Sequence, residues 1–230
     1  MFGLDDSIAH LSAGGSTLVV ILVAVLLGLR HATDPDHLAA VTALVASGRE
    51  RAGRRAARLG AFWGLGHATT LVLFGLPILL FDRYLPEPFQ RGAETAVAAL
   101  IVFLAVRLLH RWRTGFFRVD AHGHDHRHRV RSPLGAYGIG LVHGMGGSAG
   151  VGVLLLAAIP SRPVAVASLG VLALFTAVSM TMLTTGFGLT LSARPLRGSF
   201  SAFAPALGTL SLAFGIWYAA SVWSLTPYPF

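Results

Sequence analysis

Six apolar runs, each about as long as a bilayer-crossing helix, restrict the folds open to this chain more than any other feature. A transmembrane helix needs about 20 residues to cross the hydrocarbon core. It also pairs all of its backbone polar groups within one segment, as the bilayer requires. The sequence therefore predicts an all-α integral membrane protein with six transmembrane helices. The runs cover approximately residues 16–47, 59–81, 92–112, 134–159, 164–191 and 202–224.

The charged residues lie mainly between the runs. Hydrophobic residues make up 54% of the chain and charged residues only 12%, and all 18 basic residues are arginines. Fourteen arginines fall in segments 48–58 and 107–131 and at Arg194 and Arg197. Because cytoplasmic loops are rich in arginine, these segments are predicted to be cytoplasmic and both termini outside, in a multi-pass protein of the cytoplasmic membrane. The arginines flank apolar runs instead of alternating with exposed aromatics, so we expect no nucleic-acid binding.

The first run contains the segment Arg30–His37, which brings five ionisable side chains and a proline to bilayer depth. Ionisable residues in a membrane segment are costly, and they usually face one another or an ion inside the bundle. Proline removes a backbone hydrogen bond, so the helix is predicted to break at Pro35. This segment is therefore the first candidate for a functional site.

A regular helix cannot aim all the polar side chains of this segment at one point. At about 100° per residue, His31 and Asp34 share a face, whereas Asp36 and His37 point elsewhere. A break at Pro35 would allow His31, Asp36 and His37 to converge on one ion. Asp34 is then expected to bind the ion, to neutralise Arg30, to accept a proton, or to lie behind the ligands.

Histidines in two other runs offer further ligands. His67 lies in the second run, followed by Thr69 and Thr70, and His143 lies in the fourth. Each could instead be a core histidine that hydrogen-bonds a neighbouring helix. Imidazoles with carboxylates suit nickel, cobalt, copper or zinc, and the chain has no cysteine to supply a thiolate. The predicted ligands are His31, Asp36, His37, His67 and His143, and the predicted supporting residues are Arg30, Asp34, Thr69 and Thr70.

The two halves of the chain resemble each other weakly. An offset of 112 residues aligns Gly28–His31 with Gly140–His143. Because each half has three helices, the halves would lie in opposite orientations, as in transporters built from inverted repeats. We therefore predict a single transmembrane domain over 1–230, with repeats at about 14–112 and 134–226. The glycines between 144 and 152 fit either close helix packing or an unwound segment.

The predicted cytoplasmic loop at about 113–133 contains four histidines within seven residues. Such a tract can capture a transition metal transiently, and it can equally be a polar linker. The histidines concerned are His122, His124, His126 and His128. The aromatic residues Trp63, Trp217, Tyr218 and Trp223 are expected to be interfacial or packing residues.

Three motifs resemble the nickel/cobalt transporter family. Residues 30–40 (RHATDPDHLAA) look like its His-x4-Asp-His signature, and residues 65–70 (LGHATT) are similar to its Gly-His-Ser/Thr motif in the second helix. Residues 140–150 (GLVHGMGGSAG) resemble the compact six-span branch, which includes urease-accessory-type nickel permeases. The resemblance implies transport of Ni²⁺ or Co²⁺.

The resemblance also implies that the signature residues, here His31, Asp36 and His37, are essential. We therefore predict a secondary transporter for Ni²⁺, with Co²⁺ as a second substrate, that works by alternating access. We expect it to need no cofactor and to have no enzyme activity. Its partners would be the divalent metal ion and the lipid bilayer. No Walker-type phosphate loop is present, so the chain is not expected to use ATP itself.

Uptake is the predicted direction, and three alternatives remain. The first is an efflux permease, because the histidine-rich loop is also reminiscent of exporters in the same family. The second is a membrane protein that holds haem between two helix histidines. The third is a metal sensor or assembly subunit in which the histidine tract is the active part.

Overall fold

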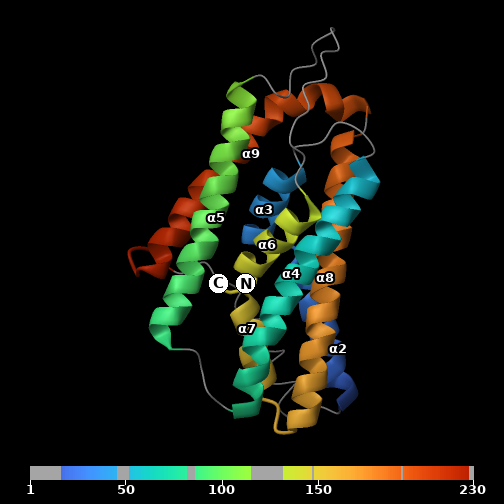
Figure 1. Cartoon of the computed structure of the whole chain (residues 1–230), viewed down its shortest axis with the longest axis vertical. Helices are drawn as coiled ribbons and strands as arrows, with labels where there is room; N and C mark the ends of the chain where they lie inside the picture. Colours follow the sequence, from blue (N-terminus) through green and yellow to red (C-terminus); the bar gives the residue numbers. More distant parts are fainter. Residues whose placement is uncertain are drawn as a thin grey trace.

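The computed structural model describes residues 17–45, 52–81, 86–114, 132–146, 148–192 and 194–227. Every regular element in these ranges is an α-helix. Figure 1 shows them as an elongated bundle. The helices are α2 (Thr17–His31), α3 (Pro35–Val45), α4 (Ala52–Phe81), α5 (Glu87–Arg113), α6 (Pro133–His143), α7 (Ser148–Ala157), α8 (Arg162–Ser192) and α9 (Arg194–Val222).

Four of these helices are long and apolar enough to cross a membrane. The spans are Gly53–Phe81, Glu87–Arg113, Arg162–Thr190 and Ala202–Val222. The first and fourth predicted runs each form two shorter helices instead, α2 with α3 and α6 with α7. The described residues thus confirm an all-helical protein with four apolar helices that could cross a membrane. The count of six crossings stays a prediction.

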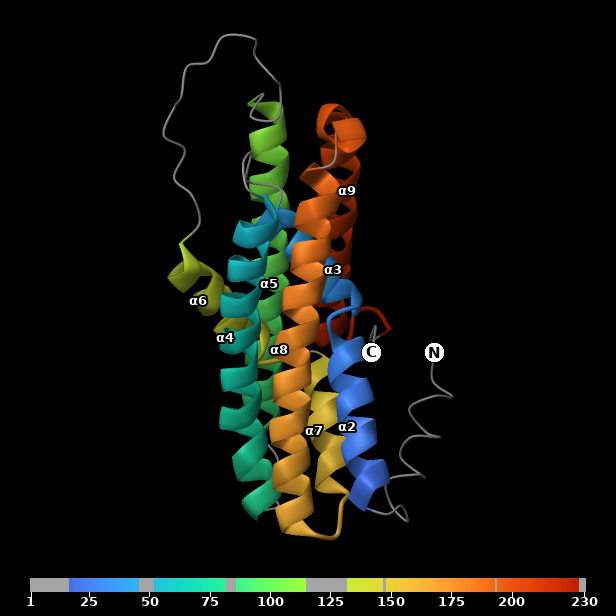
Figure 2. The same cartoon turned by 90° about the vertical axis from the view of Figure 1, so that its right-hand side faces the viewer.

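The two longest helices, α4 and α8, pack along each other and form the centre of the bundle. Helix α2 packs on α8, and α6 packs on α4. Helices α5 and α9 pair with each other, with α3 against both. Figure 2 shows α4 beside α8, with α2 and α7 in the same half of the molecule and α3 in the other half. The short helices therefore approach the middle of the bundle from opposite ends.

Two apolar clusters meet at the middle of α4. Towards its end, Leu71 and Leu79 pack with residues of α2, α7 and α8. Nearer its start, Leu59 and Trp63 pack with residues of α3, α5, α6 and α8. His67 lies on α4 between these two sets, so the polar residue falls at the boundary between the apolar layers. This boundary is where the candidate site is found.

Candidate metal centre

Five polar side chains from four helices meet inside the bundle. His31 ends α2, Asp36 and His37 lie in the first turn of α3, His67 is in the middle of α4, and His143 ends α6. His31 is 8% exposed, and the other four are at most 1% exposed. The structure thus brings together all five residues that the sequence predicts as metal ligands. Whether they bind a metal stays a prediction.

Pro35 breaks the first apolar run between His31 and the pair Asp36 and His37. Proline has no N–H to donate to the carbonyl of His31, so α2 cannot continue through it. The N–H of Asp34 instead donates to that carbonyl at 3.2 Å, which closes a tight turn. Helix α3 then begins at Pro35, where a missing N–H has no cost. The predicted break in the first helix is therefore present.

A second interruption places His143. Helix α6 ends at His143, and α7 begins at Ser148, so the fourth run is broken at its glycines. The N–H of Gly144 donates to the carbonyl of Gly140 and closes the last turn. A Cβ atom at Gly144 would lie 2.8 Å from the carbonyl oxygen of His67. Both predictions for this segment hold, because it is interrupted and its glycine also permits close packing.

The donor atoms fall into two close sets. The Nε2 atoms of His31 and His67 are 2.8 Å apart. On the other side, His143 Nε2 lies 3.1 Å from Asp36 Oδ2, and His37 Nδ1 lies 2.9 Å from Asp36 Oδ1. The two sets that could each hold one ion are His31, His37 and His67, and Asp36, His37 and His143.

Three buried ring nitrogens of the cluster have no hydrogen-bond partner among the described residues. They are His37 Nε2, His67 Nδ1 and His143 Nδ1. A buried polar atom without a partner costs about 1–3 kcal/mol, and such atoms are rare without a functional reason. Imidazole nitrogens with carboxylate oxygens are ligands for borderline divalent metals such as nickel, cobalt and zinc. The buried imidazoles and the Asp36 carboxylate could therefore hold an ion of that class.

The supporting residues predicted from the sequence occupy different positions. Asp34 Oδ2 lies 3.5 Å from His31 Nδ1, behind the ligand nitrogen that faces His67. Thr70 Oγ1 lies within hydrogen-bond distance of the carbonyls of Gly66 and Leu141, which links α4 to α6. The roles of these residues stay predictions.

Two further supporting residues lie on exposed surface. Arg30 is an exposed residue in the last turn of α2, and its carbonyl accepts the hydroxyl of Thr33 at 2.6 Å. The hydroxyl of Thr69 donates to the carbonyl of Leu65 and accepts from Tyr137 at 3.2 Å. The histidine tract with His122, His124, His126 and His128 lies outside the described residues.

Trp63 adjoins the cluster, although the sequence analysis treated it only as an interfacial or packing aromatic. It is fully buried, and its ring centroid lies 5.7 Å from that of His37 and 5.8 Å from that of His143. This contact could have been predicted from the sequence, because Trp63 lies four residues before His67 and residues i and i+4 share a helix face. Packing is confirmed for Trp63, and its contact with the two histidines is the part that the sequence analysis missed.

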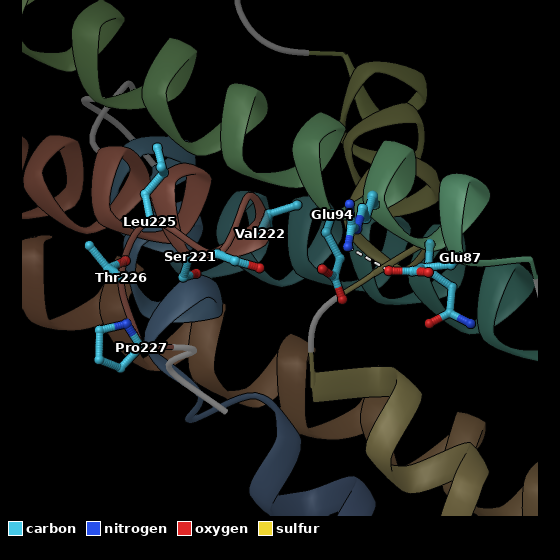
Figure 3. Close-up of a pocket in the computed structure, with 10 residues that line it drawn as sticks. Glu87, Glu94, Ser221, Val222, Leu225, Thr226 and Pro227 are labelled. Carbon is cyan, nitrogen blue, oxygen red and sulfur yellow. Dashed lines mark hydrogen bonds and ion pairs between the residues drawn. The ribbon is translucent and has the colours of Figure 1, made fainter.

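An open polar pocket of about 590 Å³ lies between the start of α5 and the end of α9. Figure 3 shows Glu87 and Glu94 on one side of it and Ser221 and Thr226 on the other. A Cβ atom at Gly146, in the α6–α7 linker, would lie 3.1 Å from the Cα of Glu94. The pocket therefore adjoins the linker that follows His143. Glu94 is the single acidic residue of its apolar run, a signal that the sequence analysis passed over.

Comparison with known proteins identifies the family. Residues 17–172 match the NicO family, described as high-affinity nickel-transport protein. The chain is 28% identical over 213 residues to the urease accessory protein UreH of Bacillus sp. (strain TB-90), covering 87% of this chain and 90% of that protein. No solved structure matches the chain significantly.

Two metal transporters match a shorter part of the chain. The nickel transporter NicT of Mycobacterium tuberculosis (strain ATCC 25618 / H37Rv) is 43% identical over 91 residues, which are 38% of this chain and 24% of NicT. The cobalt transport protein NhlF of Rhodococcus rhodochrous is 32% identical over 88 residues, 38% of this chain and 25% of NhlF. Because the family match covers more than half of the sequence, the chain belongs to the NicO family of nickel-transport proteins.

Proposed function

We propose that this chain is a secondary transporter that carries Ni²⁺, and Co²⁺ as a second substrate, into the cell across the cytoplasmic membrane. Transport of nickel or cobalt across a membrane follows from its family and relatives. The observation that carries the proposal further is the buried cluster of His31, Asp36, His37, His67 and His143. These residues would hold the transported ion.

The cluster has the chemistry of a site for a divalent ion in passage. Four imidazoles and one carboxylate supply borderline nitrogen ligands and a single negative charge. An ion held there keeps part of its positive charge uncompensated in a medium of low dielectric constant. Such binding favours release, and a transport site must release its ion as well as bind it.

Six crossings are proposed by counting each broken pair as one span. At 1.5 Å per residue, α2 and α3 are about 22 and 17 Å long, so together they can cross a core of about 30 Å. Helices α6 and α7, with 11 and 10 residues, can cross it as a pair in the same way. Interrupted backbone at this depth is tolerated where it lines a site inside the protein.

Reciprocal packing supports the inverted repeat. Gly28 packs against α8, where its Cβ would lie 2.8 Å from the carbonyl oxygen of Leu172. Gly140, 112 residues later, packs still more closely against the backbone of Trp63 on α4. Each half thus lays a short helix on the long helix of the other half. A two-fold axis in the membrane plane would produce this exchange, and rocking about it would give alternating access.

The two sides of the cluster differ in a way that favours uptake. The arginine distribution places the start of α5 and the end of α9 outside. The open pocket then faces the exterior, and Glu94, which lines it, lies next to Gly146 of the α6–α7 linker. Trp63, Leu59 and their apolar neighbours lie between the cluster and the cytoplasmic side. The apolar layer with Leu71 and Leu79 lies on the exterior side, against α2, α7 and α8, where none of its residues lines the pocket. A cation arriving from outside would therefore meet a polar pocket before the site.

Nickel uptake by cells tests this function. We expect His37→Ala and Asp36→Ala to abolish ⁶³Ni²⁺ uptake, because each removes a buried ligand, while both variants still reach the membrane. His110→Ala is the matched control, since it removes an exposed imidazole on α5 away from the cluster. Wild-type uptake by both ligand variants would refute the site. Greater nickel tolerance in cells that express the chain, with lower nickel accumulation, would refute uptake in favour of efflux.

A further inference from the structure

We propose that the cluster provides two adjacent metal positions that share His37, and that the ion passes between them. This inference rests on the proposed function and specifies how its site is divided. The described donors form two groups of three, each with its ligand atoms within 4.8 Å of one another. His37 belongs to both groups, and each of the other four residues belongs to one.

The close pair in each group is spaced like two ligands of one ion. With metal–nitrogen bonds of about 2.0–2.1 Å, ligands 90° apart around an ion are about 2.9 Å from each other. The Nε2 atoms of His31 and His67 are 2.8 Å apart, and His143 Nε2 is 3.1 Å from Asp36 Oδ2. Each pair therefore forms one edge of a separate coordination site.

His37 has the geometry of a shared ligand. Its ring centroid lies 4.4 Å from that of His31 and 4.4 Å from that of His143, so it stands between the two pairs. Its Nδ1 atom faces Asp36 at 2.9 Å, whereas its buried Nε2 atom has no hydrogen-bond partner among the described residues. The two nitrogens of an imidazole point away from each other. One ring can therefore serve two positions, one with each nitrogen.

The two positions differ in charge. Asp36 supplies a carboxylate to the position with His37 and His143. The position with His31, His37 and His67 has only neutral ligands, and Asp34 lies behind His31 at 3.5 Å from Nδ1. An ion therefore binds more weakly among the three histidines. Because two divalent ions a few ångströms apart repel strongly at low dielectric constant, the positions are occupied one at a time.

Metal binding by the purified full-length protein tests this division. When two positions exclude each other, their association constants add. His67→Ala removes the weaker position, so it should raise the Kd for Ni²⁺ by no more than about two-fold. His143→Ala removes the tighter position and leaves binding at the three histidines. The double variant should lose binding, and both single variants should lose transport in proteoliposomes, because passage needs both positions.

X-ray absorption of the Ni²⁺-loaded variants identifies the ligands that remain. We expect two imidazoles and a carboxylate in His67→Ala, and three imidazoles without the carboxylate in His143→Ala. His110→Ala serves as the matched control and should bind and transport like the wild type. Loss of all binding in each single variant, or the same ligand shell in both, would overturn the two positions. Failure of the wild type itself to bind and transport Ni²⁺ would instead overturn the proposed function.

Discussion

At the scale of single residues, the cluster is arranged so that most of its polar atoms face one another. Asp36 has a histidine nitrogen near each oxygen, from His37 at 2.9 Å and from His143 at 3.1 Å. Removing one partner from a buried polar pair leaves the other uncompensated and is strongly destabilising. Substitutions here therefore change the neighbouring ligands as well as the residue replaced.

Asp34 is predicted to support the candidate ligand His31. Its carboxylate lies 3.5 Å from His31 Nδ1, and we expect it to orient the ring. Loss of such a carboxylate typically weakens metal binding by 10–100-fold. In the His143→Ala background, where Ni²⁺ is expected to bind only at the three histidines, we expect Asp34→Asn to raise the Kd for Ni²⁺ by about that factor, as measured by titration of the purified protein. Thr33→Ala, at the exposed neighbour, is the control in the same background, and an unchanged Kd after adding Asp34→Asn would contradict this role.

Trp63 provides an optical probe of the same site. Ni²⁺ and Co²⁺ quench the fluorescence of an indole that lies against their ligands, and the ring of Trp63 is 5.7 Å from that of His37. In a variant whose other three tryptophans are replaced by phenylalanine, we expect saturable quenching on addition of Ni²⁺. Adding Asp36→Ala together with His67→Ala, which removes a ligand from each position, should remove the saturable part.

The complementary variant is Trp63→Phe, which keeps Trp112, Trp217 and Trp223. These three are partly exposed residues away from the described cluster, at 37%, 40% and 58% exposure. Their fluorescence should show no saturable response to Ni²⁺. Saturable quenching of the same size in Trp63→Phe would place the binding site elsewhere.

At the scale of elements, close packing of α6 on α4 fixes His143 relative to His67. Gly140 approaches the backbone of Trp63 and His67 so closely that a Cβ atom there would overlap the carbonyl oxygen of Trp63. Thr70 adds a hydrogen bond from α4 to the carbonyl of Leu141 at 2.9 Å. The separation of these two helices therefore determines whether the histidines can act together.

Gly140→Ala should force the two helices apart. Overpacking of this kind costs about 1–3 kcal/mol, so we expect a lower unfolding temperature in detergent and lower nickel uptake. Gly138→Ala is the matched control, because a Cβ atom on the same helix meets nothing within 4 Å. Equal stability of the two variants would show that the contact at Gly140 does not hold α6 in place.

At the scale of the whole molecule, the arginine distribution predicts the orientation in the membrane, and the packing of the helices bears on the symmetry between the two halves. The arginines predict a side for each end of the bundle, whereas the packing of short helices on the opposite long helices supports the proposed two-fold relation. Which end faces the cytoplasm stays a prediction. The chain has no cysteine, and single cysteines can therefore report the orientation without a background.

Labelling with a membrane-impermeant maleimide measures the topology. Gln90→Cys lies near the start of α5, and Thr114→Cys lies just after its end. In intact cells we expect the first variant to be labelled and the second to be protected until the membrane is opened. The reverse pattern would invert the predicted orientation and place the pocket beside Glu94 inside the cell.

Much of this protein was determined by its sequence alone. Apolar runs predict helices because a bilayer leaves no other way to pair the backbone of a single segment. Pro35 predicts the break in the first helix, and ionisable residues at bilayer depth indicate the candidate ligands. Both conclusions follow from local chemistry. The family was likewise evident from motifs, and the later comparison confirmed it.

Only the tertiary structure decided which residues touch. Lipid is as apolar as a protein core, so hydropathy does not separate the two faces of a membrane helix. On α4, Leu71 is buried and Leu73 is 63% exposed, although both are leucines in the same run. The pairing of His31 with His67 and of Asp36 with His143 depends on how four helices cross. Contacts between residues so far apart in the sequence are set by the packing of the helices, and no single segment of the sequence encodes that packing.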